Sequence, residues 1–112
     1  MANIIPFSFR GELFSGTHDF ASGGNQFKIA LYTSNPYSTS STAYLTTNEV
    51  SASGGSNYTA TGNILASQAV ASGTAVASVD FADTSWTSAT FTAAFAAIYN
   101  DTNSDKLCVV LD

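Results

Sequence analysis

Charged side chains are scarce in this chain, and positive ones are the scarcest. Charged residues make up 10% of the 112 positions, and the three cations Arg10, Lys28 and Lys106 face eight acidic residues, for a formal net charge of −5. Nucleic-acid binding needs clustered Lys and Arg that displace counterions from phosphates. A basic patch is equally needed to hold a protein on an anionic membrane surface. Three scattered cations therefore exclude both functions.

Cysteine is nearly absent as well. Cys108, the one cysteine, lies in the apolar run from Leu107 to Leu111 and is predicted to be a small buried hydrophobe, without any disulfide in the chain. Such a chain is typical of a protein made in a reducing cytoplasm. No apolar run reaches the roughly 18 residues that cross a bilayer. Met1–Pro6 lacks the basic and apolar regions of a secretory signal.

Histidine is limited to His18, which restricts the chemistry open to the chain. A nucleophilic triad needs Ser, His and an acid that converge in a shaped pocket. His18 follows a Gly-Thr turn and precedes Asp19, and we predict a surface or interface histidine. Zinc would need more His and Cys than the chain has, and no phosphate-binding loop or nucleophile elbow occurs. We therefore predict that the protein is not an enzyme and has no catalytic, cofactor-binding or metal-binding residue.

The run Asp101–Asp105 carries oxygen-bearing side chains at alternate positions, as the first half of a calcium loop does. Counted from Asp101, the sixth position is Lys106, where the calcium loop needs Gly for a sharp turn. The twelfth position is Asp112, where a bidentate Glu is preferred. A hairpin loop that is merely polar is the favoured interpretation, with calcium as the alternative.

Small side chains are common in this chain, in which charged residues are few. Thirty residues are Ser or Thr, and the hydrophobic share of 45% relies on Ala and on aromatic residues. The length predicts one domain over residues 1–112. Because a domain of this size buries roughly 65% of its unfolded surface, an alanine-rich core is expected to need neighbouring subunits for part of its stability.

Local patterns predict one helix and several strands. Pro6 suits the start of a short N-terminal helix, and Gly16 suits its end. Apolar residues at every second position predict a half-buried strand at Gln26–Tyr32. Further strands are predicted at Asn63–Val70, at Thr74–Phe81 and, as a central strand, at Lys106–Leu111.

Two segments admit more than one interpretation. The apolar residues of Ala89–Asn100 fit helical spacing as well as strand spacing. The stretch Thr33–Asn57 is rich in Ser, Thr, Asn, Gly and Pro, and it is predicted to be a long, exposed excursion with a function. Its residues Tyr37 and Tyr44 would either contact a carbohydrate or pack on the sheet.

Two stretches resemble a recurrent pattern of small virion proteins from tailed bacteriophages. The first comprises Thr47–Ser51, Gly54, Gly55 and Tyr58–Ala60, and the second comprises Asp80–Trp86 and Ser88–Ala93, followed by Ile98-Tyr99-Asn100. The N-terminal Phe-containing helix and the strand Lys28–Ser34 also look like this family, so the resemblance covers most of the chain. It implies a strand, not a helix, for the segment after Ala89.

The resemblance also implies structural roles for single residues. Asn48 and Glu49 would cap or staple the loop, Trp86 would anchor the core, and no residue would be catalytic. Family members continue past the strand that matches Lys106–Leu111 with one further strand. Either the chain is expected to be truncated at Asp112, or the edge of the sheet is expected to be open and to accept a strand from a neighbour.

These observations predict a mainly β fold, an antiparallel β-sandwich with one short N-terminal helix. The predicted function is that of a non-enzymatic bacteriophage virion structural protein, first of all a capsid decoration or cement protein. The alternatives are a tail, neck or fibre accessory protein that touches the host, and a carbohydrate-binding module. The expected partners are copies of the chain itself and a major capsid or tail protein, and the expected location is the virion.

Overall fold

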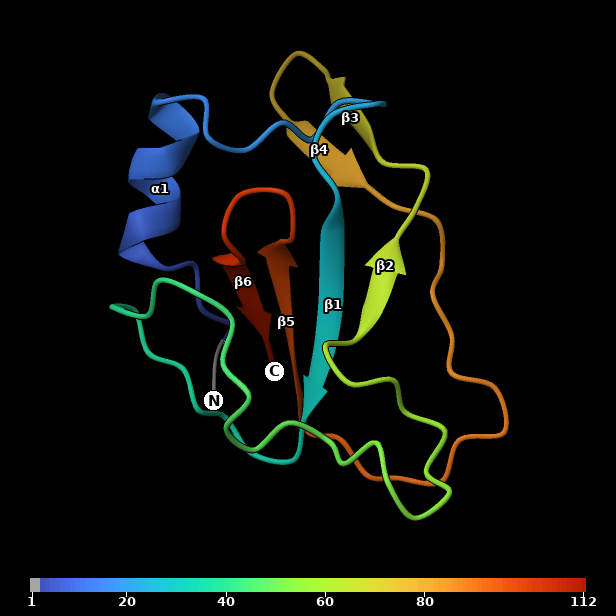
Figure 1. Ribbon diagram of the computed structural model, residues 1–112. Coiled ribbons are helices and arrows are strands. Elements are labelled where there is room, and N and C mark those ends of the chain that lie inside the picture. Colours follow the sequence, from blue (N-terminus) through green and yellow to red (C-terminus); the bar gives the residue numbers. More distant parts are fainter. Residues whose placement is uncertain (1–2) are drawn as a thin grey trace.

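The computed structural model describes residues 3–112 as one helix and two antiparallel sheets (Figure 1). The larger sheet has the strand order β2-β1-β5-β6, and the smaller is the pair β3-β4. The mainly β, antiparallel fold with one short N-terminal helix is thereby confirmed, with two sheets of very unequal size. The elements are α1 (Phe7–Phe14), β1 (Phe27–Tyr32), β2 (Asn63–Leu65), β3 (Ala69–Ser72), β4 (Ala77–Asp80), β5 (Phe95–Asn100) and β6 (Lys106–Leu111).

Helix α1 begins and ends where its flanking residues require. Pro6 occupies the N-cap in an extended conformation, so its missing N–H costs no helical hydrogen bond. Gly16 follows the helix at φ 75°, a left-handed conformation that glycine adopts without strain. None of the helical residues is buried, and Phe14 is 93% exposed. The predicted helix is confirmed, but most of its apolar surface faces outward.

Strand β1 is covered on both faces, so the prediction of a half-buried strand is wrong. Ala30 and Tyr32 are fully buried on one face, and Phe27 is fully buried on the other. The alternation at Gln26–Tyr32 located the strand correctly. The number of covered faces depends on segments far away in the sequence, which the alternation does not report.

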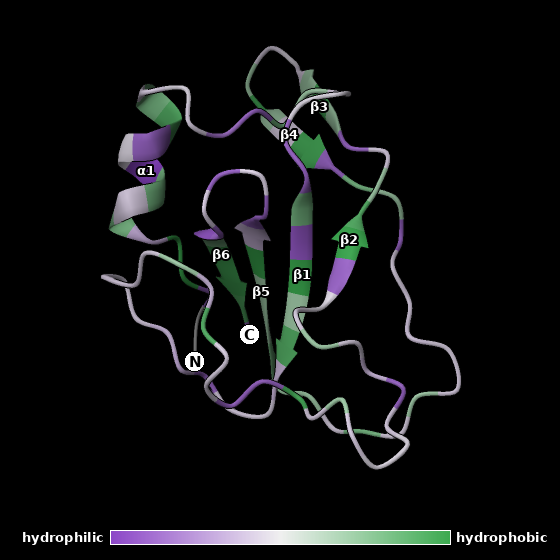
Figure 2. Ribbon diagram, viewed as in Figure 1, coloured by the Kyte–Doolittle hydropathy of each residue, from purple (hydrophilic) through white to green (hydrophobic). Residues whose placement is uncertain are grey.

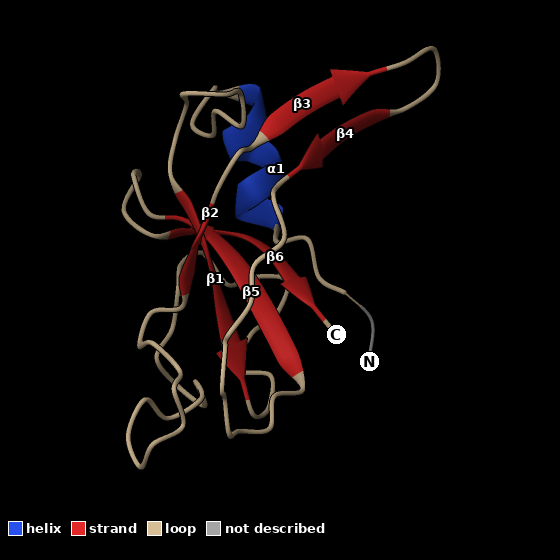
Figure 3. Ribbon diagram, turned by 90° about the vertical axis from the view of Figure 1, so that its right-hand side faces the viewer, coloured by secondary structure: helices blue, strands red, loops and turns tan. Residues whose placement is uncertain are grey.

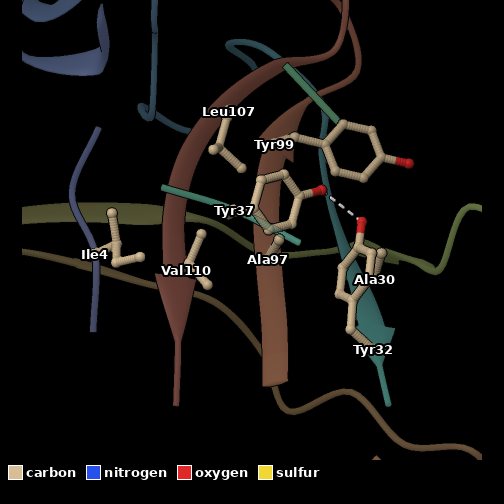
Figure 4. Packing of buried hydrophobic residues seen from close by; sticks show 8 residues of the cluster. All are labelled: Ile4, Ala30, Tyr32, Tyr37, Ala97, Tyr99, Leu107 and Val110. Carbon is tan, nitrogen blue, oxygen red and sulfur yellow. Dashed lines mark hydrogen bonds between the residues drawn. The ribbon is translucent and has the colours of Figure 1, made fainter. Parts of the chain in front are cut away.

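Two apolar clusters lie on the two faces of the larger sheet, and Figure 2 shows its strands β5 and β6 in the green of hydrophobic residues over much of their length. The cluster drawn in Figure 4 comprises Ile4, Ala30, Tyr32, Tyr37, Ala97, Tyr99, Leu107 and Val110. The opposite cluster comprises Phe27, Leu65 and Cys108, with Phe9, Phe20, Ile29, Phe81 and Ile98 packed against it.

Strand β6 lies at the edge of the sheet, so its predicted central position is wrong. Its outer edge is nevertheless paired within the chain. Ile4 and Val110 exchange two backbone hydrogen bonds of 2.9 Å, and the Leu107 N–H donates to the Thr42 carbonyl at 3.0 Å. The open edge that the family resemblance implied at this strand is therefore closed by two segments of the same chain, as edge protection requires.

The remaining predicted strands are shorter than expected. Asn63–Val70 divides into β2 and the start of β3, separated by Ser67 at φ 55°. Of Thr74–Phe81, the four residues of β4 form a strand. In the ambiguous segment, Phe95–Asn100 forms β5, so the strand interpretation is confirmed there, and the predicted hairpin loop connects it to β6.

Candidate functional site

Most residues of the stretch Thr33–Asn57 are exposed, as predicted, but a few of its side chains pack on the larger sheet. Tyr37 and Val50 are each 5% exposed, and the Tyr44 ring stacks on Tyr99 with ring centroids 4.7 Å apart. Of the two roles considered for Tyr37 and Tyr44, packing on the sheet is the one observed. Tyr37 therefore offers almost no surface to a carbohydrate, and the Tyr44 ring is partly covered by the sheet.

A single carboxylate holds this stretch in place. Glu49 accepts hydrogen bonds from the hydroxyls of Tyr44 and Tyr58 and from the Thr61 N–H. The prediction that Glu49 staples the loop is confirmed. Asn48, just before it, adopts φ 62°. Its backbone carbonyl oxygen accepts a 2.9 Å hydrogen bond from the Thr33 N–H.

His18 is buried, so the prediction of a surface histidine is wrong. Its side chain is fully buried, with Nε2 2.8 Å from Glu12 Oε1 and Nδ1 2.9 Å from Asn100 Nδ2. Cys108 Sγ lies 3.8 Å from the same Nδ1. The structure thus places a thiol, an imidazole and a carboxylate in one row, an arrangement that sequence spacing did not reveal.

The details of this row fit a structural link. The side-chain oxygen of Asn100 accepts hydrogen bonds from the N–H groups of Thr102 and Asn103. The side-chain N–H₂ group of Asn100 therefore points to His18, and Nδ1 of His18 accepts a hydrogen bond from it. Cys108 is 2% exposed, and burial raises the pKa of its thiol to about 12, with Glu12 adding to the shift. A thiol of this kind is protonated at neutral pH and is a poor nucleophile. The row joins α1 to the β5–β6 hairpin.

The side chains of the candidate calcium loop point to separate partners. Asp101 accepts a 2.7 Å hydrogen bond from Gln26 and lies 3.7 Å from the Lys28 ammonium group. Asn103 donates to the Thr17 carbonyl at 2.6 Å. Within residues 3–112 no three potential ligands from His, Cys, Asp and Glu come together.

The smaller sheet is an arm that carries no buried residue. Figure 3 shows β3 and β4 projecting from the body of the molecule as a twisted hairpin. All eight strand residues are exposed, and Val70, Val76 and Val79 are 55%, 69% and 43% exposed. No charged residue occurs between Glu49 and Asp80. Strand β3 therefore presents an outer edge without charged or proline residues, and β4 has one charged residue, Asp80, at its end, so little discourages strand addition.

An apolar groove of about 360 Å³ lies at the base of this arm. A β-bulge in β6 places two successive residues, Cys108 and Val109, against the groove, because Val109 pairs with Ile98 while Leu107 pairs with Tyr99. No charged side chain contributes to it. The lining residues are Ile5, Phe9, Leu13, Phe20, Val79, Phe81, Ile98, Cys108 and Val109.

Sequence reasoning missed both the arm and the groove. A signal for the arm exists in the run Ala69–Val79, which has strand-forming residues but no large side chain to bury. The groove had no such signal, because its lining comes from the N-terminal segment, the arm and the β5–β6 hairpin. Comparisons with protein-family models, curated proteins and solved structures give no match to the chain. Among the described residues, no helix is long and apolar enough to span a membrane.

Proposed function

We propose that this chain is a non-enzymatic structural protein of a tailed-phage virion, which binds neighbouring subunits through its β3–β4 arm and the groove beside it. The observation that carries the proposal is the arm itself. A two-stranded hairpin is marginally stable in water, and this one leaves all its strand residues exposed. A partner that covers it would stabilise both the arm and the complex.

The chemistry of the arm favours strand addition as the mode of contact. Its outer edges offer backbone N–H and C=O groups that a strand of another subunit can pair with. Each exposed valine that becomes covered would contribute about 1 kcal/mol. Val79 belongs to the arm and also lines the groove, so one partner segment lying along β4 would reach both.

The charge distribution supports a second copy of the chain as one of these partners. Two copies repel each other because each has a net charge of −5. The arm from Ala69 to Val79 and the groove lining are free of charge, so contact through them brings no like charges together. Other copies and the capsid protein beneath them are the partners that a decoration protein needs.

The proposal of a phage origin depends on the two sequence stretches described above, which are Thr47–Ser51 with Gly54, Gly55 and Tyr58–Ala60, and Asp80–Trp86 with Ser88–Ala93. A capsid decoration protein is the first choice, and a tail, neck or fibre accessory protein is the second. The copy number in purified particles separates them, since hundreds of copies indicate a capsid and six to a few dozen indicate a tail or neck, by the symmetry of these assemblies.

The experiment uses charge placed on the arm. In a Val70→Lys/Val76→Lys variant both substituted side chains are exposed, so the fold is expected to persist. The matched control, Thr47→Lys/Ser53→Lys, adds the same charge at exposed positions away from the arm. We expect the wild type and the control to associate at micromolar concentration and to be incorporated into particles, and the arm variant to remain monomeric and unincorporated. Incorporation of the arm variant at the wild-type level would refute the proposal.

A further inference from the structure

A second hollow, on a different side of the molecule, surrounds the single tryptophan. In Figure 1 the segments after Ser56 and after Ala82 run together beyond β2, on the opposite side of β1 from α1. They enclose a pocket of about 440 Å³ that shares no residue with the arm or the groove. Its lining consists of Asn57, Thr59, Asn63, Ser85, Trp86, Thr87 and Ser88.

Hydrogen bonds between the two segments hold the walls of this pocket. Asn57 Nδ2 donates to the Ser88 carbonyl at 2.8 Å, and the Thr90 N–H donates to the Ser56 carbonyl at 2.9 Å. Asn63 Nδ2 donates to the Ser85 carbonyl at 3.2 Å. A pocket whose walls are already joined loses little conformational entropy when a ligand enters.

The pocket offers hydrogen-bonding groups that the rest of the described chain leaves free. The two asparagines, Asn57 and Asn63, use their N–H₂ groups on the walls, and their carbonyl oxygens accept no hydrogen bond from residues 3–112. The lining also contains four Ser and Thr residues, and their hydroxyl groups make no hydrogen bond with any residue in the range 3–112. Neutral acceptors and hydroxyl groups therefore surround the space, without any charge.

Trp86 belongs to the lining of this pocket and is half-buried; it lies outside both apolar clusters of the larger sheet but packs on the buried Tyr58, so its predicted anchoring role is met at the edge of the core. Its ring stacks on Tyr58 with ring centroids 6.2 Å apart and an interplanar angle of 20°. Tyr58 is fixed in turn by Glu49 and by the Leu31 N–H. A ligand in the pocket meets the part of Trp86 that Tyr58 leaves exposed, beside a lining that is mostly polar.

The indole N–H of Trp86 has no hydrogen-bond acceptor within residues 3–112. Among the buried side-chain nitrogen and oxygen atoms of the described residues, Nε1 of Trp86 is the one without a hydrogen-bond partner. Leaving such a group unsatisfied costs about 1–3 kcal/mol. Because this nitrogen is itself buried, an oxygen atom from outside these residues reaches it only if the segment around Trp86 shifts.

We propose that the Trp86 pocket binds a neutral saccharide. A pyranose ring has an apolar C–H face that packs on an indole and hydroxyl groups that bond to amide oxygens and to Ser and Thr hydroxyls. Phosphate, carboxylate and ammonium ligands find no counter-charge, since no charged residue lines the pocket. Because the pocket is separate from the arm, an assembled subunit would keep it open to a glycan of the host surface or to a free sugar.

The test uses the intrinsic fluorescence of Trp86, which reports on this pocket alone because the chain has one tryptophan. The probes are oligomers of glucose, of mannose and of N-acetylglucosamine, with oligogalacturonate as an anionic counterpart. A Thr87→Glu variant places a carboxylate on the exposed lining without removing the fluorophore, and Thr47→Glu is the matched control elsewhere.

We expect a saturable change with at least one neutral oligomer at a dissociation constant of about 1 mM or below, and none with oligogalacturonate. Thr87→Glu should weaken this binding at least about tenfold, while Thr47→Glu leaves it unchanged. Calorimetric titration of Trp86→Ala, checked for folding by circular dichroism, should show no binding. The absence of a response to every neutral oligomer, or equal affinity in Thr87→Glu and the control, would overturn the proposal. Either result leaves the assembly test at the arm unaffected.

Discussion

The Tyr58 hydroxyl donates a 2.6 Å hydrogen bond to Oε2 of Glu49, and it also accepts one of 3.0 Å from the Leu31 N–H of β1. One phenol thus connects the loop carboxylate to the backbone of the central strand. The same carboxylate binds Tyr44, whose ring stacks on Tyr99 of β5. Glu49 is consequently the point at which the long loop is fastened to the sheet.

Replacing this carboxylate should loosen the loop. Glu49→Ala leaves the hydroxyls of Tyr44 and Tyr58 and the Thr61 N–H without their acceptor, and we expect a loss of about 2–4 kcal/mol in the free energy of unfolding. Urea denaturation followed by circular dichroism measures it. The matched control is Asp83→Ala, which removes an exposed carboxylate and should change stability by less than about 0.5 kcal/mol. Equal stability of the two variants would show that Glu49 is not the fastening point.

We expect the free energy of unfolding to fall at alkaline pH because of the tyrosines. Burial raises the pKa of all five above the ordinary value of 10.0, with neighbouring Tyr and Glu49 groups adding to the rise at Tyr32, Tyr44 and Tyr58. Above pH 10 the unfolded chain releases phenolic protons that the folded chain retains. The free energy of unfolding is therefore complete below pH 10 and falls as the pH rises beyond it.

Urea midpoints measured between about pH 8 and pH 12 test this, with phenolate absorbance recorded in parallel. Phenolate should form together with unfolding and not before it. Tyr44→Phe removes one titrating group and should make the decline shallower. Phenolate absorbance that appears near pH 10 while the protein remains folded would contradict the expected rise in pKa.

Two glycines should respond in opposite directions to the same change. Gly62 adopts φ 87°, and a methyl group on it would collide with the Ile29 carbonyl of β1. Gly62→Ala should therefore destabilise by more than about 2 kcal/mol or prevent folding. Gly11 lies in α1 with no atom within 4 Å of an added methyl group, so Gly11→Ala should stabilise by about 0.5–1 kcal/mol. Thermal unfolding of both variants measures the two changes in stability. A change of the same sign in both variants would contradict the prediction.

The Cys108 thiol should be unreactive in the folded protein. It is 2% exposed, and burial raises its pKa to about 12, so little thiolate is present near neutral pH. We expect a disulfide reagent to label it at the rate of unfolding, and rapidly once denaturant is added. Rapid labelling of the native protein at pH 7 would instead indicate an activated thiol in the row with His18 and Glu12.

Elements that depend on neighbours in the sequence were predictable. Pro6 and Gly16 delimit α1 through their own backbone preferences, and the continuous apolar run of β6 specifies a strand whatever surrounds it. Glu49 was recognised as a loop staple through the family resemblance, although its tyrosine partners were not identified.

Decisions about which face is covered belonged to the tertiary structure. The alternation in β1 is the same whether one face or both faces are packed. The loop that covers the second face follows the strand, and it contributes Tyr37 to the cluster there. The buried state of His18 likewise depends on Asn100 and Cys108, more than 80 residues away, meeting it from the β5–β6 hairpin.

The candidate sites show the same division. The sequence by itself determined that charged residues are scarce, that no charged residue interrupts the region from Val50 to Val79, and that Trp86 is the single tryptophan. Tertiary structure decided that β3 and β4 project from the body and that Trp86 faces a polar pocket. The reason is physical: composition fixes what a surface can bind, whereas exposure is set by long-range packing that short-range patterns do not encode.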